Sequence, residues 1–124
     1  MNIIELLGIN TKQLTQNQVI MTLNVTENIQ QPYGIVHGGI NALLAETAAS
    51  VGANENLQTS DSVAVGIDIM THHLKPVTSG CLIATAKPIS IGRTIQVWQV
   101  NITATNEQLT SVSTVTLKNQ VLPK

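Results

Sequence analysis

The chain has few of the residues that mark several classes of protein. Its 124 residues include no Phe, one Tyr, one Trp and a single cysteine, Cys81. One cysteine cannot form a disulfide within the chain, and the sequence lacks the spaced Cys and His residues of structural zinc sites. No apolar run approaches the roughly 20 residues of a membrane-spanning helix, and the N-terminus lacks the pattern of a signal peptide. We therefore expect a cytoplasmic protein that binds no metal, needs no cofactor and does not enter a membrane.

Charge is also scarce. Charged residues make up only 10% of the chain, and the formal net charge is -1. The basic residues are scattered singly, so they form no patch for nucleic acid. Because a small monomer needs polar surface, so little charge predicts that another subunit covers part of this one.

Branched aliphatic residues dominate the composition instead. Ile, Val and Thr supply 41 of the 124 residues, and branching at Cβ favours strands. Alternating patterns predict strands over residues 18–26, 62–71, 81–91, 93–105 and 109–118. In the second of these, Val63, Val65, Ile67 and Ile69 are expected on one face. Short connections favour antiparallel pairing, and residues 3–9 fit a short helix or an edge segment.

Residues 38–53 have a different pattern, with five Ala, no Pro and one charge. Ile40, Leu43, Leu44, Thr47 and Val51 fall on one helical stripe, and alanines occupy the opposite side. This pattern predicts a helix that is buried on nearly all sides. With one strand before it and four after it, the sequence predicts an α+β class, in which a curved antiparallel sheet wraps a central helix as a single domain over residues 1–124.

Glu46 is the one charged residue of the predicted helix. A carboxylate is seldom buried without a partner, and one in an apolar setting is a candidate for catalysis. The alternative is that Glu46 reaches water at an exposed edge of the helix. Ser50 lies one turn further on and shares its face.

His37, Gly38 and Gly39 stand at the start of the same helix. Free backbone N–H groups and the positive end of the helix dipole occur there, and glycines let a ligand approach the backbone closely. This arrangement suits a carbonyl oxygen that gains negative charge, although it also fits a plain helix start with a capping histidine. Together with the acid nine residues after His37, it supplies the two halves of an acyl-transfer site.

Two other polar groups are candidates for substrate binding. His72 and His73 are adjacent on a strand and face opposite ways, so at most one of them lines a pocket, and a shared metal site is disfavoured. The turn Gly92-Arg93-Thr94 is either a plain turn or a phosphate site, because Arg donates a fixed fork of hydrogen bonds.

A nine-residue stretch, Gln31–Gly39 (QPYGIVHGG), followed by Leu44-Ala45-Glu46-Thr47, resembles the signature of hotdog-fold acyl-CoA thioesterases. The chain is similar to the PaaI-like group of that family, and most similar to its branch of 1,4-dihydroxy-2-naphthoyl-CoA hydrolases of menaquinone biosynthesis. Residues 65–69, 87–88 and 96–99 fit the same branch. The resemblance covers roughly residues 16–119.

This resemblance implies a helix wrapped by a curved antiparallel sheet, in a homodimer that pairs further into a homotetramer as a dimer of dimers. It also implies sites at the dimer interface that use residues of both chains. By position, Glu46 matches the catalytic carboxylate, and Gly38 matches the N–H that polarises the thioester carbonyl. Gln31 and His37 match supporting polar residues, and Ser50 matches a hydroxyl that assists the acid or its water.

The candidate substrate-binding residues are Gly39, His73, Gly92, Arg93 and Thr94. At position 73 the family has His or an aromatic residue, and where this chain has His72 the family often has Asn.

We therefore predict an acyl-CoA thioesterase that releases a free acid and CoA, with aromatic acyl groups such as 1,4-dihydroxy-2-naphthoyl included. Glu46 either attacks the carbonyl directly or takes a proton from water. Two alternatives stay open at this point. One is a hotdog dehydratase that acts on 3-hydroxyacyl thioesters, and the other is a non-catalytic acyl-CoA-binding module that could dispense with Glu46.

Overall fold

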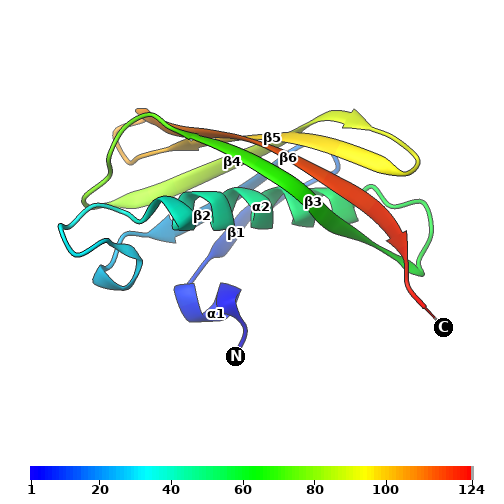
Figure 1. Cartoon of the computed structure of the whole chain (residues 1–124), viewed down its shortest axis with the longest axis horizontal. Coiled ribbons are helices and arrows are strands. Elements are labelled where there is room, and N and C mark those ends of the chain that lie inside the picture. The colour runs from blue at the N-terminus through cyan, green and yellow to red at the C-terminus, as the bar shows by residue number, and fades with distance from the viewer. Residues whose placement is uncertain (124) are drawn as a thin grey trace.

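The computed structural model describes residues 1–123, in which one curved sheet arches over a long helix (Figure 1). The elements in chain order are α1 (Ile3–Leu7), β1 (Asn10–Leu14), β2 (Val19–Asn24), the 3-10 helix η1 (Glu27–Ile29), α2 (Gly38–Asn54), β3 (Ser62–His73), β4 (Cys81–Ile91), β5 (Ile95–Thr103) and β6 (Leu109–Val121). No helix in this described part is long and apolar enough to cross a membrane.

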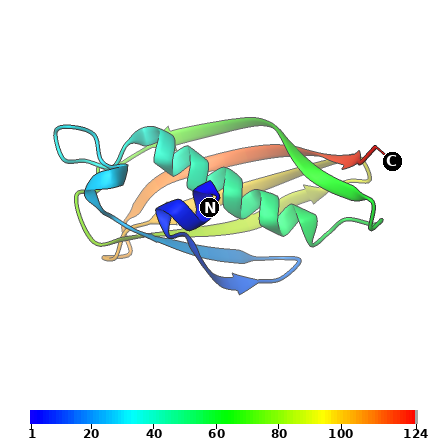
Figure 2. The ribbon, with the colours of Figure 1, turned by 90° about the horizontal axis from the view of Figure 1, so that it is seen from below.

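The six strands of residues 1–123 form a single sheet in the order β1-β2-β4-β5-β6-β3, and each neighbouring pair is antiparallel. Seen from below, α2 runs along the long dimension of the sheet on its concave side (Figure 2). The predicted α+β class, with a curved antiparallel sheet around a central helix, is therefore confirmed. The strand β3 follows α2 in sequence and has β6 as its single neighbour in this order, so it forms one edge of the sheet.

The C-terminal half of α2 is fixed to the sheet around Trp98, which is fully buried. The indole Nε1 of Trp98 donates to Gln96 Oε1 at 2.9 Å, and Gln96 Nε2 donates to the carbonyl of Ala53 at 3.0 Å. Gly52 lies directly against the indole, because a Cβ built on it would stand 2.5 Å from the Trp98 ring. The close approach of helix and sheet therefore depends on a residue without a side chain.

We expect Gly52→Ala to destabilise the protein by about 1–3 kcal/mol, although Ala is the better helix former. The added methyl would overlap a ring that its hydrogen bond to Gln96 holds in place. Urea unfolding of the two proteins measures the difference. The loss of unfolding free energy caused by Gly52→Ala should be smaller in a Trp98→Phe background. An equal loss in both backgrounds would show that overlap with the indole is not the cause.

One side of α2 is open, so the prediction of burial on nearly all sides is wrong for that side. Glu46 is exposed, and Leu43, Thr47, Ser50 and Val51 are half-buried. The buried stripe faces the sheet and differs from the predicted stripe; it consists of Asn41, Leu44, Ala45, Ala48, Ala49, Gly52 and Ala53. Small side chains dominate it because the helix packs closely on the strands.

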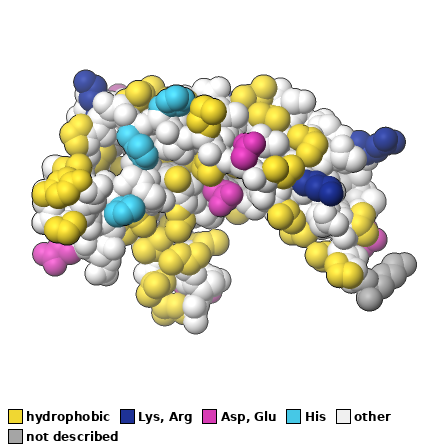
Figure 3. Space-filling view, viewed as in Figure 1, with side chains coloured by type: hydrophobic (Ala, Val, Ile, Leu, Met, Phe, Trp, Pro, Cys, Tyr) yellow, Lys and Arg dark blue, Asp and Glu magenta, His cyan; other side chains and the backbone are white. Residues whose placement is uncertain are grey.

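Residues Ile3–Leu7 form the short helix α1, so the helical option for residues 3–9 is confirmed. This helix lies beside the open side of α2, where its Ile4 lines a cavity together with Glu46. It has no buried residue, and exposed hydrophobic side chains gather over it at the bottom of the space-filling view (Figure 3). Ile3, Ile4 and Leu6 are among them. The strand that follows, β1, was outside the predicted elements; all five of its residues are exposed.

A bulge interrupts β3 and overturns the alternation predicted for it. The register against β6 shifts between Gly66 and Asp68, which leaves Ile67 as an extra residue. Ala64 is buried ahead of the bulge and Ile69 packs on the core after it, whereas Val65 and Ile67 are exposed. Val65 and Ile67 therefore do not share a buried face with Ile69.

Candidate active site

The chain enters α2 through a tight turn that hydrogen bonds hold in place. The N–H of Gln31 donates to the carbonyl of Ile35 at 2.7 Å, and Gly34 takes a φ of 86° in the turn, a value that favours glycine. The N–H of Val36 then donates to Val77 O, and that of His37 donates to Ile29 O. These bonds fix the position of the first residues of the helix.

The first turn of α2 leaves one of its two glycine amides free. His37 is the N-cap, and its Nδ1 accepts from the N–H of Gly39 at 2.9 Å. The N–H of Gly38 has no partner among residues 1–123, as expected at a helix start. The capping role considered for His37 is thus seen, and it occupies the amide of Gly39 rather than that of Gly38.

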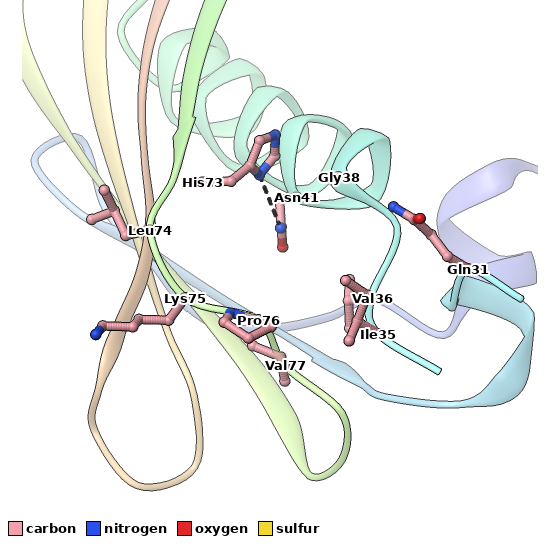
Figure 4. A pocket seen from close by; sticks show the side chains of 10 residues that line it. All are labelled: Gln31, Ile35, Val36, Gly38, Asn41, His73, Leu74, Lys75, Pro76 and Val77. Atoms are coloured by element: carbon pink, nitrogen blue, oxygen red, sulfur yellow. Dashed lines mark hydrogen bonds between the residues drawn. The ribbon is translucent and has the colours of Figure 1, made fainter. Parts of the chain in front are cut away.

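A cavity of about 320 Å³ opens beside Gly38; we call it the Gly38 cavity. Gln31, Asn41 and His73 line it together with Gly38, and their side chains surround it in Figure 4. The contact with His73 is close, because a Cβ on Gly38 would lie 3.1 Å from His73 Cε1 and Nε2. Of the two histidines, it is His73 that reaches this cavity, in keeping with the rule that adjacent strand residues face opposite ways.

A second cavity, of about 490 Å³, lies on the open side of α2; we call it the Glu46 cavity. Glu46 and Ser50 line it with Ile4 of α1 and Gly66 of β3. The carboxylate rests against the strand, since a Cβ on Gly66 would stand 2.5 Å from Glu46 Oε2. The absence of a side chain at Gly66 therefore makes room for the carboxylate.

Within one chain the two cavities are separate. Gly38 and Glu46 are eight residues apart on α2, which is about 12 Å along the helix axis. Their neighbours on β3, His73 and Gly66, are roughly 20 Å apart along the strand. One chain therefore places Gln31, Gly38 and His73 together, and Glu46 and Ser50 together, but it does not bring the two groups to one point.

The turn Gly92-Arg93-Thr94 lies outside both cavities. It connects β4 and β5 at the opposite end of α2 from Gly38 (Figure 1). Asn119 Nδ2 donates to the carbonyls of Gly92 and Arg93, at 3.2 and 2.9 Å, so the turn is tied to β6. In a single chain these residues are therefore remote from the other candidates.

Two residues of the cavities were missed by the analysis of the sequence. Asn41 is buried at the floor of the Gly38 cavity, and Gly66 receives the Glu46 carboxylate. An Asn inside a helix is a weak signal that could have been noticed, because Asn is a poor helix former. Gly66 gives no such signal. Among residues 1–123, no group of three or more His, Cys, Asp or Glu is placed to hold a metal ion.

Comparison with known sequences places the chain beside thioester hydrolases. The pattern of the Thioesterase superfamily matches residues 33–111. A 1,4-dihydroxy-2-naphthoyl-CoA hydrolase of Listeria monocytogenes is 37% identical over 117 residues, which cover 94% of both chains. The 1,4-dihydroxy-2-naphthoyl-CoA thioesterase 2 of Arabidopsis thaliana is 35% identical, over 92% of this chain and 76% of its own.

A solved structure agrees with these matches. The crystal structure of a thioesterase from Haemophilus influenzae superposes with a TM-score of 0.92 at 37% identity, over 98% of this chain and 84% of the other. The matched pattern begins at Tyr33, in the loop before α2, and includes the whole of α2, β3, β4 and β5.

Proposed function

This chain belongs to the thioesterase superfamily and is a thioester hydrolase of the hotdog fold; from that premise we propose that it hydrolyses acyl-CoA thioesters to a free acid and coenzyme A. The observation that carries the proposal is the free N–H of Gly38 at the start of the 17-residue helix α2. An amide in this place, with the helix dipole behind it, stabilises a carbonyl oxygen that gains negative charge.

Glu46 supplies the second requirement of the reaction. In one route its carboxylate attacks the thioester carbon, expels the thiolate and forms an anhydride that water then cleaves. In the other route it takes a proton from a water molecule that attacks the same carbon, and the thiolate leaves with a proton. Ser50 lies in the same cavity and is placed to orient the acid or the water. Oxygen-18 from labelled water in the Glu46 carboxylate after one turnover would require the first route.

We propose that a second copy of the chain joins the two cavities into one site. The edge strand β3 is 12 residues long and has no strand partner on its outer side within residues 1–123. Three of its hydrophobic side chains are largely exposed: Val65 at 45%, Ile67 at 54% and Met70 at 61%. A long, apolar, unpaired edge is avoided in stable monomers, because it pairs readily with another strand.

The positions along β3 favour antiparallel pairing about a two-fold axis. An axis between Ile69 and Met70 would set Gly66 of one chain opposite the partner's His73, because these two residues are equally far from it. Glu46 lies against Gly66, and Gly38 lies against His73. The carboxylate of one chain would then meet the Gly38 amide of the other, which gives two identical sites per dimer.

A shared site predicts that two defective chains restore one another. We expect Glu46→Gln and Gly38→Pro each to be inactive as pure proteins, but to regain about one quarter of the wild-type activity when they are co-expressed in equal amounts. Half of the dimers would then be mixed, and one of the two sites in each mixed dimer would hold both native residues. Thioester hydrolysis per milligram measures the recovery.

Two controls accompany this experiment. The same variants purified separately and mixed just before the assay should stay inactive until subunits exchange, and light scattering should show particles larger than 13.2 kDa. If the co-expressed pair is no more active than either variant alone, the site lies within one chain and the joint site is wrong.

The relatives direct the choice of the first substrate. Because two of them bear the name of 1,4-dihydroxy-2-naphthoyl-CoA hydrolysis at 37% and 35% identity, we propose this thioester as the first of a panel that also contains phenylacetyl, hydroxybenzoyl and fatty acyl-CoA. Release of free thiol scores hydrolysis, and hydration of an enoyl-CoA scored beside it tests the dehydratase alternative. The proposal fails if no acyl-CoA of the panel is cleaved.

A further inference from the structure

The inference starts from an unsatisfied polar atom in the Gly38 cavity. Asn41 is only 7% exposed, yet its Oδ1 has no hydrogen-bond partner in residues 1–123. Its Nδ2 stands 3.4 Å from Nδ1 of His73. Figure 4 shows the amide of Asn41 with its nitrogen end toward His73 and its oxygen end on the side away from that ring, among the residues that line the cavity.

An acceptor in such a place has a cost to stability. Buried polar groups are almost always hydrogen-bonded, and one left without a partner loses its hydration without compensation. Asn is also a poorer helix former than an apolar residue such as Leu, which could fill the same position. A partner that arrives with a ligand explains why the chain keeps an acceptor here.

The position of Asn41 relative to Gly38 limits what that ligand group can be. The two residues are three apart on α2, so they lie on the same face of the helix about 4.5 Å apart along its axis. A thioester whose carbonyl oxygen rests on the Gly38 N–H would therefore extend past Asn41 Oδ1 within a few bonds of the carbonyl.

We propose that Asn41 Oδ1 accepts a hydrogen bond from an N–H or O–H group that the thioester substrate carries next to its carbonyl. This inference rests on the proposed function of the Gly38 amide. Two parts of an acyl-CoA carry such a donor: a hydroxyl group on the acyl moiety, and the first amide N–H of the CoA arm beyond the sulfur. Asn41 would thus favour substrates that carry a hydrogen-bond donor at this position.

A second buried atom provides a matched control. The hydroxyl of Ser111 is likewise without a partner in the described residues, and Ser111 pairs with His73 across β3 and β6. Ser111 is fully buried and does not line the Gly38 cavity. It therefore neighbours His73, as Asn41 does, but lies outside the cavity in which the substrate is proposed to bind.

The experiment compares kcat/KM for two pairs of substrates that differ only in the donor. In the first pair, 2- or 3-hydroxybenzoyl-CoA is set against benzoyl-CoA. In the second, the benzoyl thioester of N-acetylcysteamine is set against the analogue in which CH2 replaces the amide N–H. We expect the wild type to prefer the donor in one pair by about tenfold or more, and the pair that shows this preference identifies the source of the donor.

The variants decide whether Asn41 causes the preference. Asn41→Leu should reduce it to within about twofold, because a buried acceptor is the origin of the discrimination, and Asn41→Ala should do the same if Leu packs poorly. Ser111→Ala should keep the wild-type preference.

Several results would overturn the inference. These are a wild type without preference in either pair, an unchanged preference in both Asn41 variants, or an equal fall of both members of a pair, which would mean that Asn41 only positions His73. If the wild type cleaves none of the thioesters, the proposed function itself is wrong.

Discussion

Replacing Glu46 by Gln is expected to lower kcat for thioester hydrolysis by about 10²–10⁴-fold, because both routes need the carboxylate as nucleophile or as base. Gln keeps the size and shape of the side chain. Within one chain Glu46 is exposed, so its charge contributes little to the folding of that chain, and in the proposed joint site the neutral Gln costs less to bury. The melting temperature should therefore hold or rise slightly, in line with surface substitutions that change stability by less than about 0.5 kcal/mol.

Glu55→Gln is the matched control for this prediction. Glu55 is an exposed carboxylate at the C-cap of the same helix, and it lines neither cavity. Hydrolysis and thermal melting should be measured on one preparation of each protein. A structural role for Glu46 would reverse the pattern, with near-normal hydrolysis and a lower melting temperature. Wild-type turnover in Glu46→Gln would rule out the mechanism, whatever the melting curve shows.

Gly38→Pro is expected to have a kcat about 10²–10³-fold lower than that of Gly38→Ala. This is roughly the loss for removing one oxyanion donor. Proline removes the N–H, and its backbone is compatible with the start of a helix. Gly38 is the first residue of α2, where proline is well tolerated. The preceding residue His37, with φ -62° and ψ 132°, already has the extended backbone that a following proline requires.

Gly38→Ala is the control, because it adds the same Cβ but retains the N–H. That Cβ would stand 3.1 Å from the His73 ring, which must move by a few tenths of an ångström. Some loss of activity in Gly38→Ala is therefore expected from crowding alone. The decisive quantity is the ratio of the two variants in kcat at saturating thioester. Equal activities would show that the Gly38 amide does not hold the carbonyl.

Regular side-chain patterns were enough to predict most of the fold. The helix expected over residues 38–53 is α2, Gly38–Asn54, and the strand expected over 81–91 is β4, Cys81–Ile91. Both segments have many apolar residues, and each has a single clear periodicity. The strand β1 could not be predicted in this way, because all five of its residues are exposed and no apolar alternation marks it.

The site was harder to predict, for physical reasons that differ between residues. Glu46 stands among alanines in the sequence, which suggested burial, but those alanines face the sheet and Glu46 faces outward. The meeting of Gly38 with His73 depends on how α2 crosses β3, and no local pattern records such a crossing. The role of Asn41 depends on which end of its amide faces His73, which no sequence pattern indicates.

The bulge at Ile67 determines which positions of β3 can face the helix. Side chains on a regular strand alternate, so two residues seven positions apart have opposite parity and point to opposite sides. Gly66 and His73 are seven apart, yet both face α2, because the extra residue Ile67 changes the parity between them. The number of residues between these two positions is therefore as strictly constrained as their identity. An insertion or deletion of one residue there would turn either the Gly66 end or the His73 end of the strand away from the helix, even if every remaining residue were kept.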